Sequence, residues 1–162
     1  MREQTPYTDN LGRLADVIAA IQVMATYKFY KLGFSDWSDR ICGDEAKGEY
    51  WKQIFIQHPE FFRLDSTREK ASLVWRRNYQ KLYDVDLQVN ISREKYLLLQ
   101  ENQKFRVSRT PLKNSDISTL INTAIDLHSR EIEHKKDSRW WISGVIGLAG
   151  VILGAVIKAV SG

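Results

Sequence analysis

The sequence predicts a mainly α-helical body with one small β-hairpin, followed by a long helix that continues into an apolar C-terminal helix. Two patterns predict this class. Apolar residues recur every three or four positions through much of the chain, which is typical of amphipathic helices. Near the end, Trp140–Ile157 form an uncharged run of membrane-spanning length. The chain has 162 residues, of which 27% are charged, so we expect a water-soluble body with an apolar appendage.

The first predicted element is an amphipathic helix from about Thr8 to Gly33. Thr8 or Asp9 can cap its start, and Gly33 fits its end. Its inward-facing residues are spaced by three or four: Leu11, Leu14, Ile18, Ile21, Ala25 and Phe29. A second, short helix follows, with Ser35 as its cap and Gly43 at its end.

A third helix is predicted from Glu45 to Gln57. It ends there because Pro59 pushes the preceding His58 out of the helical region. Its inward-facing residues are large and mostly aromatic: Tyr50, Trp51, Ile54 and Phe55.

A β-hairpin follows the third helix. Residues 61–64 and 71–75 have the composition of strands, and the polar segment 65–70 can form the turn between them. Three helices followed by a hairpin is the element order of a winged helix, and residues 8–77 resemble that fold. The resemblance rests on element order, and it implies a winged-helix-like domain over residues 1–84.

The rest of the chain is divided into three segments. Residues 85–114 are expected to form an irregular extension with one short helix, capped by Ser92. A stalk helix over residues 115–139 carries an apolar stripe that should pack on the body. The stripe consists of Ile117, Leu120, Ile121, Ala124 and Leu127. The last segment, residues 140–160, is predicted to be a transmembrane helix.

The length and flanks of the apolar run support this last prediction. As a helix, its eighteen uncharged residues cover roughly 27 Å, close to the hydrocarbon thickness of a bilayer. Trp140 and Trp141 at one end and Lys158 at the other suit the membrane interfaces. The alternative is a buried core helix, but a body of this size would have to surround a helix that is apolar on every side. Membrane lipid is therefore an expected partner.

Basic residues beside the apolar run predict its orientation. Lys158 is the one basic residue on the far side, whereas four precede the run within about twenty positions. These four are Arg130, Lys135, Lys136 and Arg139. We expect a tail-anchored protein of the inner (cytoplasmic) membrane, with a single span and a cytoplasmic N-terminus. A lone cysteine, Cys42, and an N-terminus without a secretory signal agree with a cytosolic body.

Small residues form one stripe along the predicted transmembrane helix. Ser143, Gly147, Gly150 and Gly154 are spaced by four, three and four, which lets helix backbones approach closely in lipid. This pattern favours a homo-oligomer. The alternative is that glycine is simply common in membrane helices.

The sequence does not favour an enzyme. Its three histidines, His58, His128 and His134, lack the spacing of helical metal ligands, and neither a phosphate-binding glycine loop nor a nucleophile elbow occurs. An HEPN-type ribonuclease would need a histidine shortly after Arg77-Asn78, and Tyr83 stands in that place. We therefore predict no catalytic residue, no metal and no cofactor.

Basic residues of the third helix and the hairpin are the candidates for binding an anionic ligand or nucleic acid. They are Lys47, Lys52, Arg63, Arg68, Lys70, Arg76 and Arg77. In winged helices such residues contact DNA. However, residues 44–77 hold seven basic and six acidic residues, and this near-balance gives little non-specific affinity for DNA. A cytosolic protein or a nucleotide fits the charge at least as well, and a mixed-charge surface without a ligand also remains open.

These features lead to one hypothesis and two alternatives. The hypothesis is a tail-anchored protein whose cytosolic module binds an intracellular partner or ligand, and whose anchor oligomerises. This architecture is similar to that of small membrane-anchored effectors in bacterial antiviral systems, which implies that clustering perturbs the bilayer. The alternatives are a membrane-tethered DNA-binding transcription regulator and a scaffold that localises a partner protein.

Overall fold

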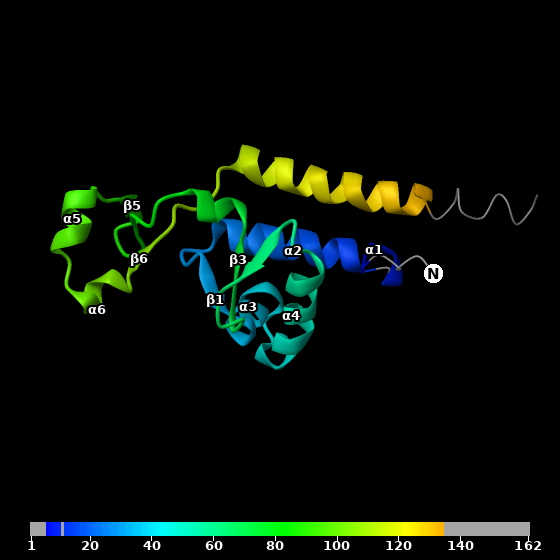
Figure 1. The fold of residues 1–162 in the computed structure, drawn as a ribbon, viewed down its shortest axis with the longest axis horizontal. Coiled ribbons are helices and arrows are strands. Elements are labelled where there is room, and N and C mark those ends of the chain that lie inside the picture. Colours follow the sequence, from blue (N-terminus) through cyan, green and yellow to red (C-terminus); the bar gives the residue numbers. More distant parts are fainter. Residues whose placement is uncertain (1–5, 11, 135–162) are drawn as a thin grey trace, which may run out of the picture.

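A computed structural model describes residues 6–10 and 12–134 of the chain (Figure 1). In chain order the elements are α1 (Pro6–Asp9), α2 (Arg13–Thr26), β1 (Lys31–Gly33), α3 (Phe34–Cys42), the 3₁₀ turn η1 (Glu45–Lys47), α4 (Gly48–Gln57), β2 (Phe62–Leu64), β3 (Lys70–Leu73), the 3₁₀ turn η2 (Trp75–Asn78), β4 (Tyr83–Asp84), β5 (Val89–Asn90), α5 (Arg93–Leu98), α6 (Glu101–Lys104) and β6 (Val107–Ser108). A long helix over residues 114–134 completes the described part of the chain.

The described residues form two three-stranded antiparallel sheets, with strand orders β1-β3-β2 and β5-β4-β6. In the first sheet β3 is central, and Ala71 lies between Leu32 of β1 and Leu64 of β2. The predicted class, a mainly α, winged-helix-like fold with one β-hairpin, is therefore wrong. The fold is mixed α/β.

One difference between the predicted and the observed fold is the place where α2 ends. The predicted helix runs to Gly33, but α2 ends at Thr26. There Tyr27 takes an extended backbone (ψ 142°), and its N–H donates to the carbonyl of Val23 at 2.9 Å. The chain beyond then pairs with β3, because ladder hydrogen bonds to a distant strand outweigh a local helical pattern that includes Phe29. At its start, α2 is preceded by Gly12 and by the separate short helix α1.

The second sheet belongs to a small unit that we call the distal lobe, residues 83–108. Tyr83 of β4 pairs with Asn90 of β5 on one side and with Ser108 of β6 on the other. This pairing replaces the irregular extension that the sequence predicts. The predicted short helix is confirmed as α5, since the Ser92 hydroxyl accepts from the N–H of Lys95 at 3.2 Å.

The main core lies between α2, α3, α4, the first sheet and the long helix. Its largest fully buried apolar side chains are Trp37, Phe55, Phe62, Ile21, Met24, Ile54 and Leu73. The indole N–H of Trp37 donates to the carbonyl of Ala71 at 2.9 Å, so its polar atom is satisfied inside the core. This bond ties α3 to the central strand.

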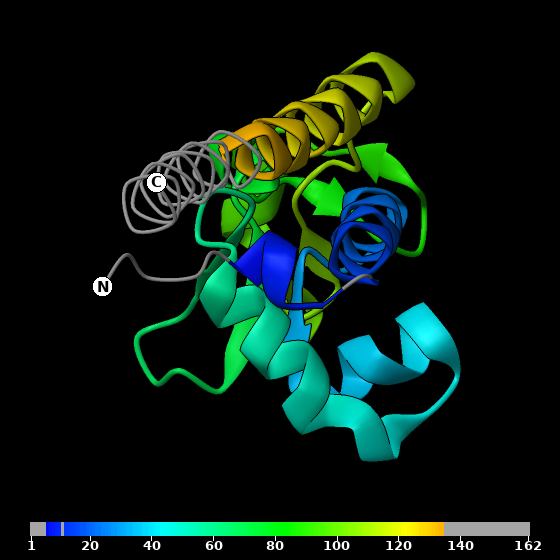
Figure 2. The ribbon, with the colours of Figure 1, turned by 90° about the vertical axis from the view of Figure 1, so that its right-hand side faces the viewer.

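The long helix runs alongside α2 (Figures 1 and 2). Leu120 and Ala124 of the predicted stripe are buried in the main core, and the N–H of Leu112 donates to the carbonyl of Ala25 just before the helix begins. The predicted packing of this stripe on the body is confirmed. Figure 1 shows the distal lobe and the C-terminal end of the long helix at opposite ends of the described molecule.

In the described part of the chain, no helix combines the length and the apolarity needed to cross a membrane. The predicted transmembrane helix, residues 140–160, lies outside the described residues. So do its packing and interface residues, namely Ser143, Gly147, Gly150, Gly154, Trp140, Trp141 and Lys158.

Candidate functional site

The structure separates the seven basic candidates into three groups. Lys47 pairs with Asp44 at 3.5 Å and Lys52 pairs with Glu49 at 3.0 Å, so both ammonium groups already have a carboxylate partner. Arg76 is fully buried. The last group is exposed on or after the hairpin and has no carboxylate within ion-pair distance among the described residues. It consists of Arg63, Arg68, Lys70 and Arg77.

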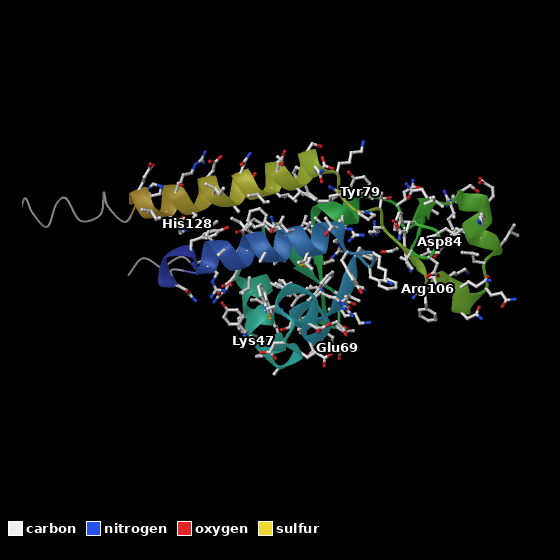
Figure 3. All side chains as sticks on the ribbon, turned by 180° about the vertical axis from the view of Figure 1, so that it is seen from behind. Lys47, Glu69, Tyr79, Asp84, Arg106 and His128 are labelled. Atoms are coloured by element: carbon white, nitrogen blue, oxygen red, sulfur yellow. The ribbon has the colours of Figure 1, made fainter. Side chains whose placement is uncertain are left out.

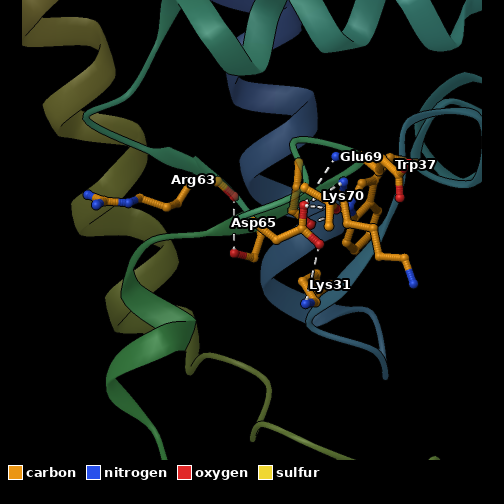
Figure 4. Close-up of polar contacts among 9 residues, drawn as sticks. Lys31, Trp37, Arg63, Asp65, Glu69 and Lys70 are labelled. Atoms are coloured by element: carbon orange, nitrogen blue, oxygen red, sulfur yellow. Dashed lines mark hydrogen bonds and ion pairs between the residues drawn. The ribbon is translucent and has the colours of Figure 1, made fainter.

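Asp65 organises the turn between β2 and β3 (Figure 4). Its Oδ1 accepts from the hydroxyl of Thr67 and from the N–H groups of Glu69 and Lys70, at 3.1, 3.1 and 3.2 Å, while Oδ2 lies 3.5 Å from Nζ of Lys31. Partial desolvation alone would raise the pKa of Asp65, but the hydrogen bonds and Lys31 outweigh it and lower the pKa. The contacts of this carboxylate therefore stabilise the turn and its link to Lys31.

The turn determines the positions of two arginines, Arg63 and Arg68. Arg68 sits in the turn with a left-handed backbone (φ 59°), a conformation that the Asp65 hydrogen bonds on either side support. Figure 4 shows Arg63 directed away from Asp65. The nearest acidic side chain of the hairpin thus neutralises neither guanidinium.

Arg63 and Arg68 line one open groove of about 290 Å³ between α4 and the hairpin, which we call the hairpin groove. Its lining is Phe55, Ile56, Pro59, Phe62, Arg63, Leu64, Asp65 and Arg68. Most of these side chains are apolar, and Ile56 is 37% exposed. The groove runs along β2, which is an edge strand of its sheet. It therefore combines an apolar surface, two unpaired guanidinium groups and a strand edge.

Arg76 has a structural role that the sequence did not indicate. Its guanidinium donates to the carbonyls of Met24, at 2.9 Å, and of Tyr27 and Arg109. Burial lowers the pKa of Arg76 to about 10. Since the side chain is enclosed, Arg76 is not available to a ligand at the surface.

Arg109 is a second arginine that the sequence analysis did not single out. Its guanidinium donates to the carbonyls of Arg77, at 2.6 Å, and of Tyr79, and it lies 4.9 Å from the ring centre of Tyr30. No local pattern could have revealed this, because the acceptors lie some thirty positions away. Together with Arg76, it fixes the two chain segments that enter and leave the distal lobe.

A polar cluster around His58 joins three segments of the chain. His58 is 1% exposed, and its Nδ1 lies 3.0 Å from Oε1 of Glu60, which also accepts from the Tyr7 hydroxyl at 3.2 Å. The ring of Tyr7 lies between the rings of His58 and His128, at 4.5 and 5.7 Å between centres. Figure 3 shows His128 on the long helix, toward its C-terminal end. The cluster therefore links α1, the end of α4 and the long helix.

Electrostatics in this cluster favour a neutral phenol and a charged carboxylate. Burial raises the pKa of Tyr7, and the neighbouring Glu60 raises it further. Burial also acts to raise the pKa of Glu60, but the hydrogen bond from His58 and the other contacts outweigh it and lower the pKa. Within the described residues, no group of three or more His, Cys, Asp or Glu side chains is arranged to hold a metal ion. We interpret the cluster as structural.

Comparison with known proteins gives no relative: no protein-family model, no curated protein and no solved structure matches the chain.

Proposed function

We propose that this chain is a membrane-attached binding protein that captures an acidic, extended segment of an intracellular protein in the hairpin groove. The proposal depends on one observation, which concerns the position and the pairing of Arg63 and Arg68. Both guanidinium groups border a groove that also exposes apolar side chains, and neither has a carboxylate partner among the described residues. Lys47 and Lys52, by contrast, are paired within the body.

The chemistry of the groove favours a peptide. A guanidinium group binds a carboxylate through two parallel hydrogen bonds, and two such groups at one groove suit a segment with more than one acidic side chain. Apolar residues such as Ile56 and Leu64 offer contacts to apolar side chains between the acidic ones. The edge strand β2 has backbone groups to which an extended peptide can add as a further strand.

Membrane attachment is supported by the sequence of residues 140–157, an uncharged run of membrane-spanning length. The long helix that precedes this run in the sequence packs on the body through Leu120 and Ala124, which are 3% and 0% exposed. The excess of basic residues before the apolar run favours a cytoplasmic body.

The test uses the full chain in a mild detergent and fluorescent ten-residue peptides that alternate glutamate with leucine. In the variant Arg63→Gln with Arg68→Gln, we expect affinity measured by fluorescence anisotropy to fall by at least about tenfold, since charge-assisted hydrogen bonds are lost. The matched control, Lys47→Gln with Lys52→Gln, removes the same charge from α4 and its neighbouring turn and should stay within about twofold of the unmodified chain.

Two results would overturn the proposal. One is an equal loss of affinity in both double variants, which would mean that only net charge matters. The other is retention of duplex DNA in place of the peptide.

The DNA-binding alternative has less support, because Arg76 is enclosed and two of the remaining six candidates are paired with carboxylates.

A further inference from the structure

The distal lobe exposes more large apolar side chains than it buries. Its own small core consists of Val85, Ile91 and Val107, none of which belongs to the main core. Five others are half exposed or more: Leu87 (60%), Val89 (50%), Leu97 (68%), Leu98 (85%) and Phe105 (78%). A small sheet with so little buried surface gains little stability by itself, and exposed apolar groups at this density are typical of an interaction surface.

The lobe is nevertheless held in place. Arg76 and Arg109 hold together the two chain segments that enter and leave the lobe, because their guanidinium groups donate to main-chain carbonyls on both segments. Within the lobe, Asp86 and Arg106 form an ion pair that links the β4–β5 turn to the chain before β6. Its apolar side chains are thus carried by a unit with a fixed attachment to the body.

The charge of the lobe indicates what kind of partner it fits. Residues 83–108 contain four basic and four acidic residues, so their net charge is zero, although the whole chain carries +4. Asp86 pairs with Arg106, and Glu101 pairs with Lys104 at 2.6 Å. A surface with zero net charge, half of whose charged side chains pair with one another, has no strong preference for an anionic membrane or for a charged protein. It does not repel an identical surface.

Complete burial of the exposed parts of these five side chains would reach the size of a small specific interface. At the roughly 150–200 Å² that a large apolar side chain offers, the five side chains expose on the order of 600 Å² per copy. Two copies together reach on the order of 1,200 Å², the lower limit of specific interfaces. Such an interface gains most from a high local concentration of the two copies.

We propose that the distal lobe docks against the distal lobe of a second copy of this chain, through a two-fold symmetric contact centred on Leu97, Leu98 and Phe105. The lobe lies at the opposite end of the described molecule from the C-terminal end of the long helix (Figure 1), so the proposed contact is far from the end that leads to the predicted span. This contact is separate from the hairpin groove and does not depend on peptide binding there, while its test in membranes rests on the membrane attachment proposed above.

The first test is disulfide cross-linking of the full chain in membranes. Cys42, the one cysteine of the sequence, is replaced by serine, and Leu98→Cys is introduced. A residue near a two-fold axis approaches its own copy, so mild oxidation should link more than about half of the chains into dimers. The control, Lys47→Cys in the same background, lies on the helical side of the body and should remain monomeric.

The second test removes the contact. The mass of the full chain in detergent is measured in the background Gly147→Leu with Gly150→Leu, so that packing within the predicted span does not contribute. We expect the dimer dissociation constant to rise at least about tenfold in Leu97→Ser with Leu98→Ser, because central apolar contacts dominate interface energy. A variant with an unchanged circular dichroism spectrum and an unchanged dissociation constant would overturn the proposal.

Membrane insertion is the other outcome that would overturn it. A fluorophore attached through Leu98→Cys would then be quenched by nitroxide-labelled lipids, and the Leu98→Cys chain would stay monomeric on oxidation. The two-copy arrangement predicts no such quenching.

Discussion

Arg76 and Arg109 each bind main-chain carbonyls of the other's segment. Nη2 of Arg76 donates to the carbonyl of Arg109, and Nη1 of Arg109 donates to the carbonyl of Arg77, the residue that follows Arg76. This exchange closes the base of the distal lobe, where the chain leaves the body and returns to it. Two cationic side chains and their backbone acceptors thus help to join the lobe to the body.

Replacing Arg76 should destabilise the protein strongly. In Arg76→Met, the carbonyls of Met24, Tyr27 and Arg109 lose a buried donor, which should lower the free energy of unfolding by about 2–4 kcal/mol. The measurement is urea unfolding of the full chain in mild detergent, followed by tryptophan fluorescence. The control Arg77→Met changes an exposed side chain and should cost less than about 0.5 kcal/mol. Equal effects of the two substitutions would contradict this role of Arg76.

Asp65 should contribute to the pH dependence of stability. Its pKa is lowered in the folded chain, so its stabilising contribution is complete above the pKa of an unfolded aspartate, about 3.9, and is lost as the pH falls through the folded value. The unmodified chain should therefore lose more stability than Asp65→Asn between about pH 5 and pH 2. Melting temperatures of the two proteins across this range provide the measurement, and parallel curves would exclude the effect.

The Tyr7 hydroxyl should hold α1 on the body. Tyr7→Phe removes its hydrogen bond to Glu60 while keeping the ring between the two histidines, so we expect a loss of about 1 kcal/mol. Hydrogen exchange at residues 7–9 should become faster, since this bond spans more than fifty positions of sequence. As a control, Tyr79→Phe removes an exposed hydroxyl from Asp116 and should leave exchange at residues 7–9 unchanged.

The glycine stripe of the predicted span can be tested in cells. If clustering through Ser143, Gly147, Gly150 and Gly154 perturbs the membrane, expression of the chain should depolarise cells that are loaded with a potential-sensitive dye. Gly147→Leu with Gly150→Leu should relieve that depolarisation. A depolarisation that persists in the double variant would reject packing through this stripe.

The sequence predicted those elements that depend on local patterns. The helices α3 and α4, the pairing of β2 with β3, and the burial of Leu120 and Ala124 all follow from periodicity, capping or turn composition. It did not predict β1, β5 or the pairing of Tyr83 with Ser108, because these strands are two or three residues long and are stabilised by partners distant in sequence. The mistaken fold class results from these short strands.

The candidate site could also be predicted only in part, because some of its residues depend on partners distant in sequence. Arg63 and Arg68 were identified as basic residues on the predicted hairpin. The pairing of Lys47 with Asp44 and of Lys52 with Glu49 could have been expected from their three-residue spacing. The burial of Arg76 could not have been expected, since its acceptors come from residues around 24–27 and 109. A basic residue in a sequence is exposed only if no distant carbonyls enclose it.

Hydrogen–deuterium exchange of the full chain, with and without a saturating glutamate–leucine peptide, tests the function of the hairpin groove most directly. If the peptide binds beside Arg63 and Arg68 along the edge of β2, exchange should slow at residues 62–65 and be unaffected around Lys47 and Lys52. Unchanged exchange at residues 62–65, or slower exchange centred on α3 and the start of α4, would place the bound peptide elsewhere and contradict the account.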